Sequence, residues 1–267
     1  MNMSSDLARS RKRQHRMSQI LEHVALRGTV SFSELSELMG ASAATIRRDL
    51  VELADRGLLA RTHGGAQLLP SRSELPVTFR DVRFPDAKRA IAFAVAELIP
   101  HQPFAVAFSG GSTTASIVRA LISHDNLTIV TNSLTIAQVA TVNSKLKVVM
   151  TGGILRPESQ ELVGVLAENT FKAINIGLAI LGTDGISAEG GVTTHDETEA
   201  RTNNAMVSHA QKTIVAADGS KVGRLTLARV ASIQQVSMLI TDSSADQEAL
   251  EAIRQKGVRV LIVDNIP

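Results

Sequence analysis

The sequence contains no cysteine, and this absence excludes both disulfide bonds and thiolate metal sites. A chain without cysteine is typical of the reducing cytosol. It also contains no apolar run of the roughly 18 residues that a membrane-spanning helix needs. No apolar segment follows the basic N-terminal residues, so a secretory signal is not indicated. We therefore expect a cytoplasmic protein with no membrane span.

Charge is unevenly distributed along the 267 residues, which provide enough chain for one large domain or two smaller ones. Residues 1–66 carry 10 Lys and Arg against 7 Asp and Glu, a net charge of +3, whereas residues 67–267 carry 18 against 19, a net charge of −1. Much of the excess lies in one basic run, which contains Arg9, Arg11, Lys12, Arg13 and Arg16. This run suits a solvated tail over residues 1–12, or an extra contact to nucleic-acid phosphates.

The next residues show the pattern of a helix-turn-helix. Apolar residues at helical spacing predict a first helix over 17–27. Ser31 and Glu34 form a capping box that opens a short helix ending at Leu38. Gly40 supplies the turn, and Ser42 is a good N-cap for a helix over 43–56, which Gly57 closes.

This last helix has one apolar and one basic face. Its buried face is expected to consist of Ile46, Leu50 and Leu53. Thr45, Arg47 and Arg48 lie near its N-terminal end, where a recognition helix presents side chains to bases and phosphates. Two alternatives remain open: a three-helix bundle without a DNA role, and a structural role for Arg48 in an ion pair with Glu52.

A basic, glycine-tipped turn follows the helix. Arg61 and His63 flank Gly64 and Gly65, an arrangement that suits the wing of a winged helix. Paired glycines also occur in ordinary hairpin turns, so this alternative stays open as well. The predicted DNA-binding residues are Ser42, Thr45, Arg47, Arg48, Arg61, His63, Gly64 and Gly65.

These motifs carry a family resemblance. Residues 30–49, with Thr45-Ile46-Arg47-Arg48-Asp49-Leu50 and Arg61-Thr62-His63-Gly64-Gly65-Ala66, resemble the winged helix of DeoR-type bacterial transcription regulators. The resemblance implies a winged helix-turn-helix domain over residues 13–68, mostly helical with a small β wing, whose helix-turn-helix covers about 30–49. Its partner would be double-stranded operator DNA.

A proline- and serine-containing linker over residues 69–85 leads to a second domain over residues 86–267. A helix is predicted over 86–99, followed by apolar strands that alternate with helices. The predicted strands are 104–108, 127–131, 146–150, 176–181, 213–217, 237–241 and 259–263, and the predicted helices include 113–122, 134–142 and 196–209. Such alternation favours an α/β domain with a mostly parallel sheet covered on both faces.

Polar and glycine residues follow the predicted strands, at the edge where parallel sheets bind ligands. Ser109, Gly110, Gly111, Ser112, Thr113 and Thr114 open a helix and form a cradle suited to phosphate. The other predicted effector-binding residues are Asn132, Gly152, Gly153, Arg156, Asp184, Asp218 and Lys221. Arg156 and Lys221 would supply positive charge, and Asn132, Asp184 and Asp218 would bond sugar hydroxyls.

Each of these loops also has a structural interpretation. A glycine-serine turn commonly joins a strand to a helix, Asn132 or Ser133 suits a helix cap, Arg156 suits a surface ion pair, and Asp218 suits a turn. The spacing does not match a nucleotide P-loop. His195, Asp196 and Glu197 are adjacent rather than spaced on one face, so no metal site is predicted.

The second domain also resembles the DeoR-type sensor domain, whose fold is similar to that of ribose-5-phosphate isomerase. The resemblance implies recognition of a phosphorylated sugar or a related metabolite, with no cofactor. One departure is Ser109, because many relatives have an acidic residue before the glycine-serine turn.

Two functions follow from different classes. The first is a regulator, most simply a repressor of sugar or related carbon-source metabolism genes, released from DNA by the effector and assembled as a dimer or tetramer. The second is a sugar-phosphate isomerase with an appended DNA-binding head. Isomerisation needs a carboxylate base, for which Asp184 is a candidate with Glu197 and Glu199 nearby. Residues 182–187 lack the second acidic residue of the isomerase pattern, so we expect no enzyme activity.

Overall fold

The computed structural model describes residues 3–67, 74, 76–80, 83–121 and 123–264. The chain divides into two compact units, Met1–Arg83 and Phe84–Pro267. Each unit has its own hydrophobic core. We call the first unit the head and the second the sensor domain.

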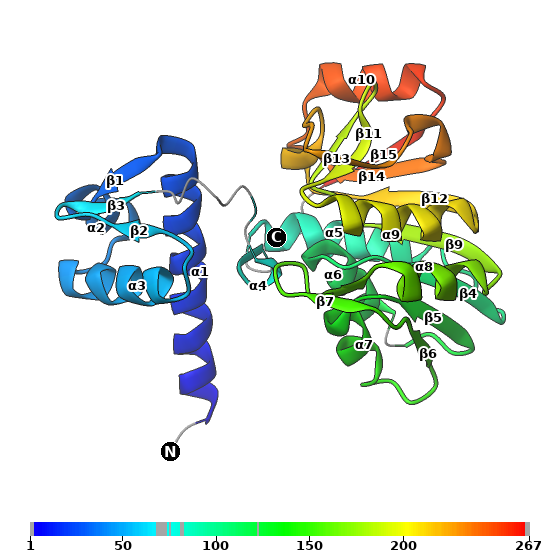
Figure 1. Cartoon of the computed structure of the whole chain (residues 1–267), viewed down its shortest axis with the longest axis horizontal. Helices are drawn as coiled ribbons and strands as arrows, with labels where there is room; N and C mark the ends of the chain where they lie inside the picture. The colour runs from blue at the N-terminus through cyan, green and yellow to red at the C-terminus, as the bar shows by residue number, and fades with distance from the viewer. Residues whose placement is uncertain (1–2, 68–73, 75, 81–82, 122, 265–267) are drawn as a thin grey trace. The chain divides into compact units, whose positions relative to one another are not determined.

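The head combines helices with a small antiparallel sheet (Figure 1). Its helices are α1 (Met3–Arg27), α2 (Phe32–Met39), α3 (Ala43–Asp55) and α4 (Val77–Arg80). Its strands are β1 (Thr29–Ser31), β2 (Ala60–Arg61) and β3 (Gly65–Gln67), in the order β1-β3-β2. Ile46, Leu50 and Leu53 are fully buried, which confirms the predicted buried face of α3.

Local signals define the ends of the head's helices. Ser31 and Glu34 form the predicted capping box of α2, and Gly40 ends that helix in the left-handed conformation at φ 54°. The Ser42 hydroxyl accepts a hydrogen bond from the Thr45 N–H at 3.3 Å, as an N-cap should. Gly57, at φ 63°, follows the C-cap residue Arg56.

Two segments of the head differ from the prediction. Helix α1 begins at Met3 rather than near residue 17, so residues predicted as a tail belong to the helix. Residues 77–80, predicted as linker, form α4. The Phe79 side chain is buried in the head's core, and its carbonyl accepts a hydrogen bond from the Ser18 hydroxyl at 2.7 Å. Burial of Phe79 and this hydrogen bond hold the short turn against α1. Most of residues 69–76, the first part of the predicted linker 69–85, lie outside the described residues.

The sensor domain is built on a seven-stranded sheet in the order β15-β14-β12-β9-β4-β5-β6. Every ladder in this sheet is parallel. The strands are β4 (Phe104–Phe108), β5 (Leu127–Thr131), β6 (Lys147–Met150), β9 (Ile176–Leu181), β12 (Ala210–Ala216), β14 (Met238–Asp242) and β15 (Arg259–Val263). The predicted parallel sheet is thus confirmed, with boundaries within a few residues.

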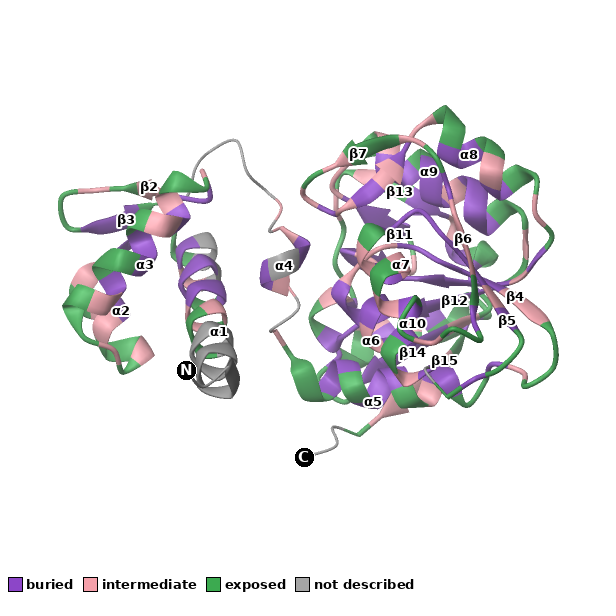
Figure 2. Cartoon of the chain, turned by 90° about the horizontal axis from the view of Figure 1, so that it is seen from below, coloured by how far each residue is buried: buried purple, intermediate pink, exposed green. Residues whose placement is uncertain are grey.

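Helices cover both faces of the sheet because strand residues point alternately to either side. On β4, Val106 and Phe108 belong to one core and Ala107 to the other. One face packs against α5 (Pro85–Ala96), α6 (Ser112–Ala120) and α7 (Leu134–Ala140). The other packs against α8 (Val165–Lys172), α9 (Glu197–Ser208) and α10 (Gln247–Gln255). Figure 2 shows buried residues concentrated on the strands and on the helix faces turned toward them.

Two further small sheets were not predicted. The first is a hairpin of β7 (Ile154–Arg156) and β8 (Glu161–Val163). The second joins β10 (Gly185–Ser187), β11 (Gly191–Thr194) and β13 (Ala228–Ala231) in antiparallel fashion. These strands have only three or four residues each, too short for a clear periodic signal.

Candidate DNA-binding and effector sites

The N-terminal half of α3 presents cations to solvent. Arg47 and Arg48 are exposed, while the neighbouring Ile46 and Asp49 are buried. The Arg47 guanidinium lies over the Phe32 ring at 5.4 Å from its centroid, a cation–π contact that orients the side chain. Arg48 makes no ion pair or hydrogen bond within the described part of the chain. The helix therefore carries one oriented and one unpaired arginine side by side.

The possible pairing of Arg48 with Glu52 is not what the structure shows. Glu52 instead forms ion pairs with Arg13 of α1 and with Arg56, the C-cap residue of α3. Those two cations neutralise the carboxylate and leave Arg48 to face outward.

Two of the basic residues near the N-terminus, Arg13 and Arg16, are ion-pair partners of Asp49. Its carboxylate is buried and lies 2.5 Å from Arg16 Nε and 3.3 Å from Arg13 Nε. A buried carboxylate requires paired charge and hydrogen bonds, which these two residues supply. Arg13 and Arg16 thus clamp α1 to α3, a correction to their interpretation as tail residues or extra phosphate contacts. The side chains of residues 3–11, including Arg9 and Arg11, lie outside the described residues; Lys12 is exposed.

The predicted wing is a hairpin of β2 and β3. Arg61 and His63 are exposed and, within the described residues, make no hydrogen bond or ion pair. The Gly64 carbonyl accepts a hydrogen bond from the Phe32 N–H at 2.8 Å, which ties the turn to the start of α2. Gly65 is required by close packing: a Cβ there would lie 1.9 Å from the Val30 carbonyl oxygen. Neither glycine has a positive φ, so close approach rather than turn type explains Gly65, whereas a Cβ on Gly64 would meet no atom within 4 Å.

In the sensor domain, the neighbouring strands β4 and β9 end beside polar loops, and we call this region the crevice. Successive strands run from β4 to one edge and from β9 to the other, which makes this pair the topological switch point of the sheet. Ligands of open α/β sheets bind at such a point, beyond the carboxyl ends of the strands. The Ser109 hydroxyl joins the two loops here by accepting a hydrogen bond from the Gly182 N–H at 3.0 Å.

The predicted phosphate cradle divides into structural and available groups. The hydroxyls of Ser109 and Thr114 donate to the carbonyls of Gly110 and Gly111, at 3.2 and 2.9 Å. By contrast, the hydroxyls of Ser112 and Thr113 form no hydrogen bond within the described residues. Gly111, at φ 126°, is the N-cap of α6 and provides no side-chain cap. The first turn of α6 therefore keeps the anion-binding character of a helix N-terminus.

Arg156 lies among carboxylates. Its guanidinium is 3.1 Å from Glu199 Oε2 and 3.4 Å from Asp196 Oδ2, and its side chain is only 14% exposed. It is therefore a part of a buried charge network rather than a surface ion pair. An anionic ligand that binds Arg156 would therefore have to share its N–H donors with these two carboxylates.

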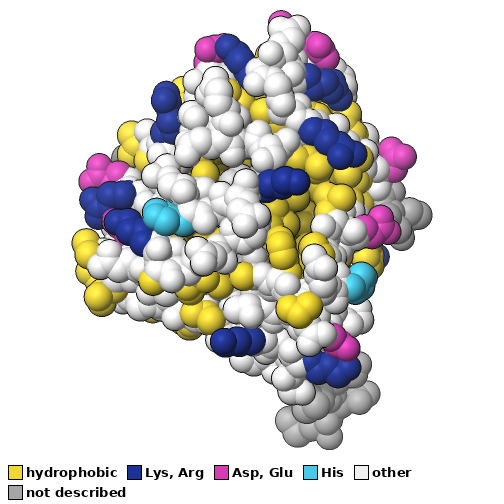
Figure 3. All heavy atoms as spheres, turned by 90° about the vertical axis from the view of Figure 1, so that its right-hand side faces the viewer, with side chains coloured by type: hydrophobic (Ala, Val, Ile, Leu, Met, Phe, Trp, Pro, Cys, Tyr) yellow, Lys and Arg dark blue, Asp and Glu magenta, His cyan; other side chains and the backbone are white. Residues whose placement is uncertain are grey.

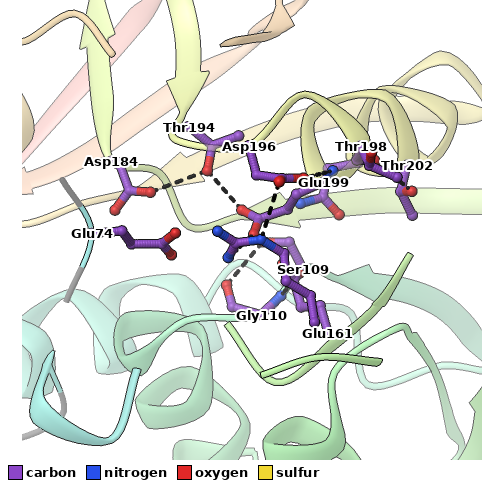
Figure 4. Close-up of polar contacts among 12 residues, drawn as sticks. Glu74, Ser109, Gly110, Glu161, Asp184, Thr194, Asp196, Thr198, Glu199 and Thr202 are labelled. Carbon is purple, nitrogen blue, oxygen red and sulfur yellow. Dashed lines mark hydrogen bonds and ion pairs between the residues drawn. The ribbon is translucent and has the colours of Figure 1, made fainter. Parts of the chain in front are cut away.

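Asp184, Thr194 and Glu199 form a chain of polar contacts, drawn with dashed lines in Figure 4. The Thr194 hydroxyl is 3.1 Å from Asp184 Oδ2 and 2.7 Å from Glu199 Oε1. Because a hydroxyl carries a single proton, Thr194 donates to one of these carboxylates at a time. The site therefore has more acceptors than this donor can satisfy.

The loop after β12 adds the remaining predicted charges. Lys221 Nζ lies 4.0 Å from Asp184 Oδ1, so the predicted cation and acid do come together. Asp218 caps a short 3₁₀ turn, Gly219–Lys221, by accepting from the Ser220 N–H and hydroxyl. Asp218 thus acts as a turn residue, the structural alternative considered for it.

The loops after β5 and β6 contribute buried polar atoms. Asn132 Nδ2 donates to Asn203 Oδ1 at 3.3 Å, whereas Asn132 Oδ1 and Thr151 Oγ1 are buried with no hydrogen-bond partner among the described residues. Buried polar atoms without partners commonly mark a site for a polar molecule. Gly153 has a φ of 139° and a Cβ there would lie 2.7 Å from the Val163 carbonyl oxygen, so its role is backbone packing. The neighbouring Gly152 is exposed.

Several residues of this site were not predicted as effector-binding. They are Glu161, Thr194, Asp196 and Glu199. Glu161 lies on β8 and Thr194 on β11, two short strands that the sequence pattern did not reveal, whereas Asp196 caps the predicted helix α9 and Glu199 lies in its first turn. Glu161 precedes a Leu-Val pair on β8. A single acidic residue beside so short an apolar run does not predict a buried carboxylate.

The described residues hold no cluster of three or more His, Cys, Asp or Glu side chains suited to a metal ion. They also include no helix long and apolar enough to cross a membrane.

An exposed, basic recognition helix with a wing, joined in one chain to a sheet with a polar crevice at its switch point, defines a DNA-binding transcription regulator with a sensor domain. The family comparisons agree. Residues 16–72 match the DeoR-like helix-turn-helix domain, and residues 83–243 match the DeoR C terminal sensor domain. The chain belongs to the DeoR family of transcription regulators.

Relatives that match this chain over nearly its whole length are named as transcription regulators. The HTH-type transcriptional regulator GlpR of Haloferax volcanii is 39% identical, over 92% of this chain and 96% of that protein. The glycerol-3-phosphate regulon repressor of Escherichia coli strain K12 is 32% identical, over 93% of this chain and 98% of that protein. Among solved structures, ribose 5 phosphate isomerase A from Neisseria gonorrhoeae aligns with 54% of each chain, at 17% identity and a TM-score of 0.38.

Proposed function

We propose that this protein is a repressor that binds operator DNA with α3 in the major groove and is released by a phosphorylated sugar or a related metabolite. The observation that carries the proposal is the exposed pair Arg47 and Arg48 at the N-terminal end of α3. Ser42 and Thr45 lie at the same end of the helix, and Arg61, His63, Gly64 and Gly65 form the wing that would contact phosphates. A relative named as a repressor of a glycerol-3-phosphate regulon supports repression rather than activation, and it supports a phosphorylated metabolite as the effector.

The effector would lie at the crevice between β4 and β9. Ser112 and Thr113 offer hydroxyls, and the first turn of α6 offers N–H groups, to a phosphate. The carboxylates of Asp184 and Glu199 meet at the Thr194 hydroxyl, and carboxylate oxygens are acceptors suited to the hydroxyls of a sugar. A phosphorylated polyol therefore suits both ends of the crevice.

Self-association is part of the proposal, because one recognition helix per chain requires two chains to contact two half-sites. Exposed apolar side chains support it. Ile154 on β7 and Val165 and Leu166 on α8 are 76%, 62% and 65% exposed. Leu166 lies beside Gly152, two residues before Ile154, so these side chains share one region. Figure 3 shows further hydrophobic side chains exposed between polar and charged ones on the face that it draws.

Because its target is DNA, we place the protein in the cytoplasm, and we expect it to use no cofactor and to catalyse no reaction. The enzyme alternative makes a clear counter-prediction. Purified protein incubated with ribose 5-phosphate should leave the sugar unchanged by NMR over hours. Steady formation of the ketose would restore the isomerase hypothesis.

The effector proposal is tested with DNA from upstream of the protein's own gene. A panel of phosphorylated sugars is added to the preformed complex, and release is followed by fluorescence anisotropy. Thr113→Val and Lys221→Ala should bind this DNA as the wild type does but respond to the active compound at least about tenfold more weakly, since each loses one direct contact. Thr170→Val, the same substitution at a threonine of α8 outside the crevice, should behave as the wild type. Unchanged release curves for both site variants would reject the crevice as the effector site.

A further inference from the structure

The N–H of Gly110, part of the proposed phosphate cradle, is bound by a carboxylate of the protein itself. It donates to Glu161 Oε1 at 2.5 Å, and the Glu161 side chain is almost fully buried. The packing is close enough that a Cβ on Gly110 would lie 2.6 Å from Glu161 Cγ. Figure 4 shows Gly110 and Glu161 next to each other. A carboxylate thus uses a donor that a phosphate of the effector would need.

The backbone around Glu161 is held on both sides. The Leu162 N–H donates to the Asn132 carbonyl at 2.7 Å, and the Leu134 N–H donates to the Gln160 carbonyl at 3.0 Å. Gln160 has a φ of 55°, a left-handed conformation that is unfavourable for a residue with a Cβ. Unfavourable backbone conformations persist where the surrounding structure requires them, often at functional sites. With the backbone fixed in this way, Glu161 can leave Gly110 only by rotation of its side chain.

Charge also argues that Glu161 and a phosphate exclude each other. Among the described residues, the crevice and its border hold the carboxylates of Glu161, Asp184, Asp196, Glu199 and Asp218, and these outnumber the two cations named above, Arg156 and Lys221. A dianionic phosphate placed on the Gly110 N–H would lie beside the Glu161 carboxylate, and like charges at this distance repel strongly where water is scarce.

We propose that Glu161 is an internal competitor of the effector's phosphate: its carboxylate holds the Gly110 N–H and must rotate away before a phosphate can bind. This inference rests on the proposed function, because it assumes that the cradle is the phosphate site. Glu161 thereby sets the effector concentration at which the regulator responds. It also favours ligands whose anionic group is strong enough to displace a carboxylate, which selects a phosphorylated compound over its unphosphorylated parent.

The test measures binding of inorganic phosphate to the full chain by isothermal titration calorimetry. Glu161→Gln keeps the size of the side chain and an acceptor for Gly110 but removes the charge, so phosphate should bind about tenfold more tightly than to the wild type, since hydrogen bonds to a charged acceptor are roughly twice as strong as neutral ones. Glu161→Asp keeps the charge but is one methylene shorter and withdraws from the N–H. Its phosphate affinity should lie between those of the wild type and Glu161→Gln.

The matched control is Glu168→Gln. Glu168 is a similarly buried carboxylate of the sensor domain, but its partner is the Arg201 guanidinium at 2.8 Å rather than the cradle. This variant should bind phosphate as the wild type does. Equal phosphate affinity for the wild type and both Glu161 variants would overturn the competition while leaving the phosphate site in place. Absence of phosphate binding to all three would overturn the competition and the proposed phosphate site together.

Discussion

The head and the sensor domain use their charged side chains in opposite ways. In the head, Arg48, Arg61 and His63 are exposed and, among the described residues, unpaired. In the sensor domain, the side chains of Arg156 and Lys221 are 14% and 15% exposed and lie beside carboxylates. The head is therefore ready to meet a polyanion without rearrangement, whereas the crevice must exchange internal partners for a ligand.

This difference suits the partners proposed for each site. DNA is a dense array of phosphates, and free cations at a surface attract it through counterion release. A small metabolite presents one phosphate and a few hydroxyls, so specificity must come from buried groups whose internal hydrogen bonds are replaced only by the correct ligand.

The largest expected effect comes from breaking the head's exposed charge. The double variant Arg47→Ala/Arg48→Ala should lose about a thousandfold in operator affinity, because each arginine at a base edge contributes about 1–3 kcal/mol. Its thermal unfolding should change little, since both side chains are exposed and the variant loses only the surface cation–π contact of Arg47 with Phe32. Fluorescence anisotropy at fixed salt measures the affinity. Arg254→Ala, which removes an exposed arginine of α10, is the control; wild-type affinity in the double variant would remove α3 from the DNA interface.

The second prediction concerns the charges that the head does bury. Arg16→Met leaves the Asp49 carboxylate in the core without its nearer partner and should destabilise the head by about 3 kcal/mol. Arg13 is 47% exposed, so Arg13→Met should cost less than about 1 kcal/mol. Hydrogen exchange of the α3 amides reports both. Equal effects of the two substitutions would contradict the assignment of Arg16 as the main partner.

A third, smaller effect distinguishes the wing from the recognition helix. Arg61→Gln should weaken binding to all DNA sequences alike and lower the salt dependence of log affinity by about 1, the loss of one phosphate contact. The measurement is a salt titration on operator and on unrelated DNA. A selective loss of operator binding would instead indicate that Arg61 contacts bases.

The smallest expected effect is a change in the pH dependence of stability, and it concerns a histidine that belongs to neither proposed site. Burial of His124, together with the neighbouring His101 ring stacked at 4.6 Å, lowers the pKa of the His124 imidazole below 6.5. The unfolded chain then binds a proton more readily than the folded one, so sensor-domain stability is full above pH 6.5 and falls as the pH drops toward the folded pKa. His124→Phe should flatten this decline in urea melts at pH 7 and pH 5. The same slope in both proteins would show that other groups cause it.

Much of the fold follows from the sequence because its signals are local and repeated. The capping box at Ser31, the N-cap at Ser42 and the apolar face of α3 each require only a few neighbouring residues. The strands of the parallel sheet are continuous apolar runs, buried on both sides, that stand out from the helices between them. Strands as short as β7 and β8 carry no such signal, and the sequence pattern missed them.

The sequence by itself determined which kinds of residue gather at each site: paired arginines and a glycine turn in the head, and hydroxyls, glycines and charges after the strands. Only the tertiary structure decided which of them are free. Arg13 and Arg16 proved to be partners of Asp49, and Ser109 and Thr114 proved to hold loops together. Glu161 lies 51 residues from Gly110 in the sequence, and no sequence pattern predicted its hydrogen bond to the cradle. The physical reason is that a charged group or a hydroxyl interacts with the partner that lies nearest to it in space. The spacing of residues along the sequence does not determine that distance.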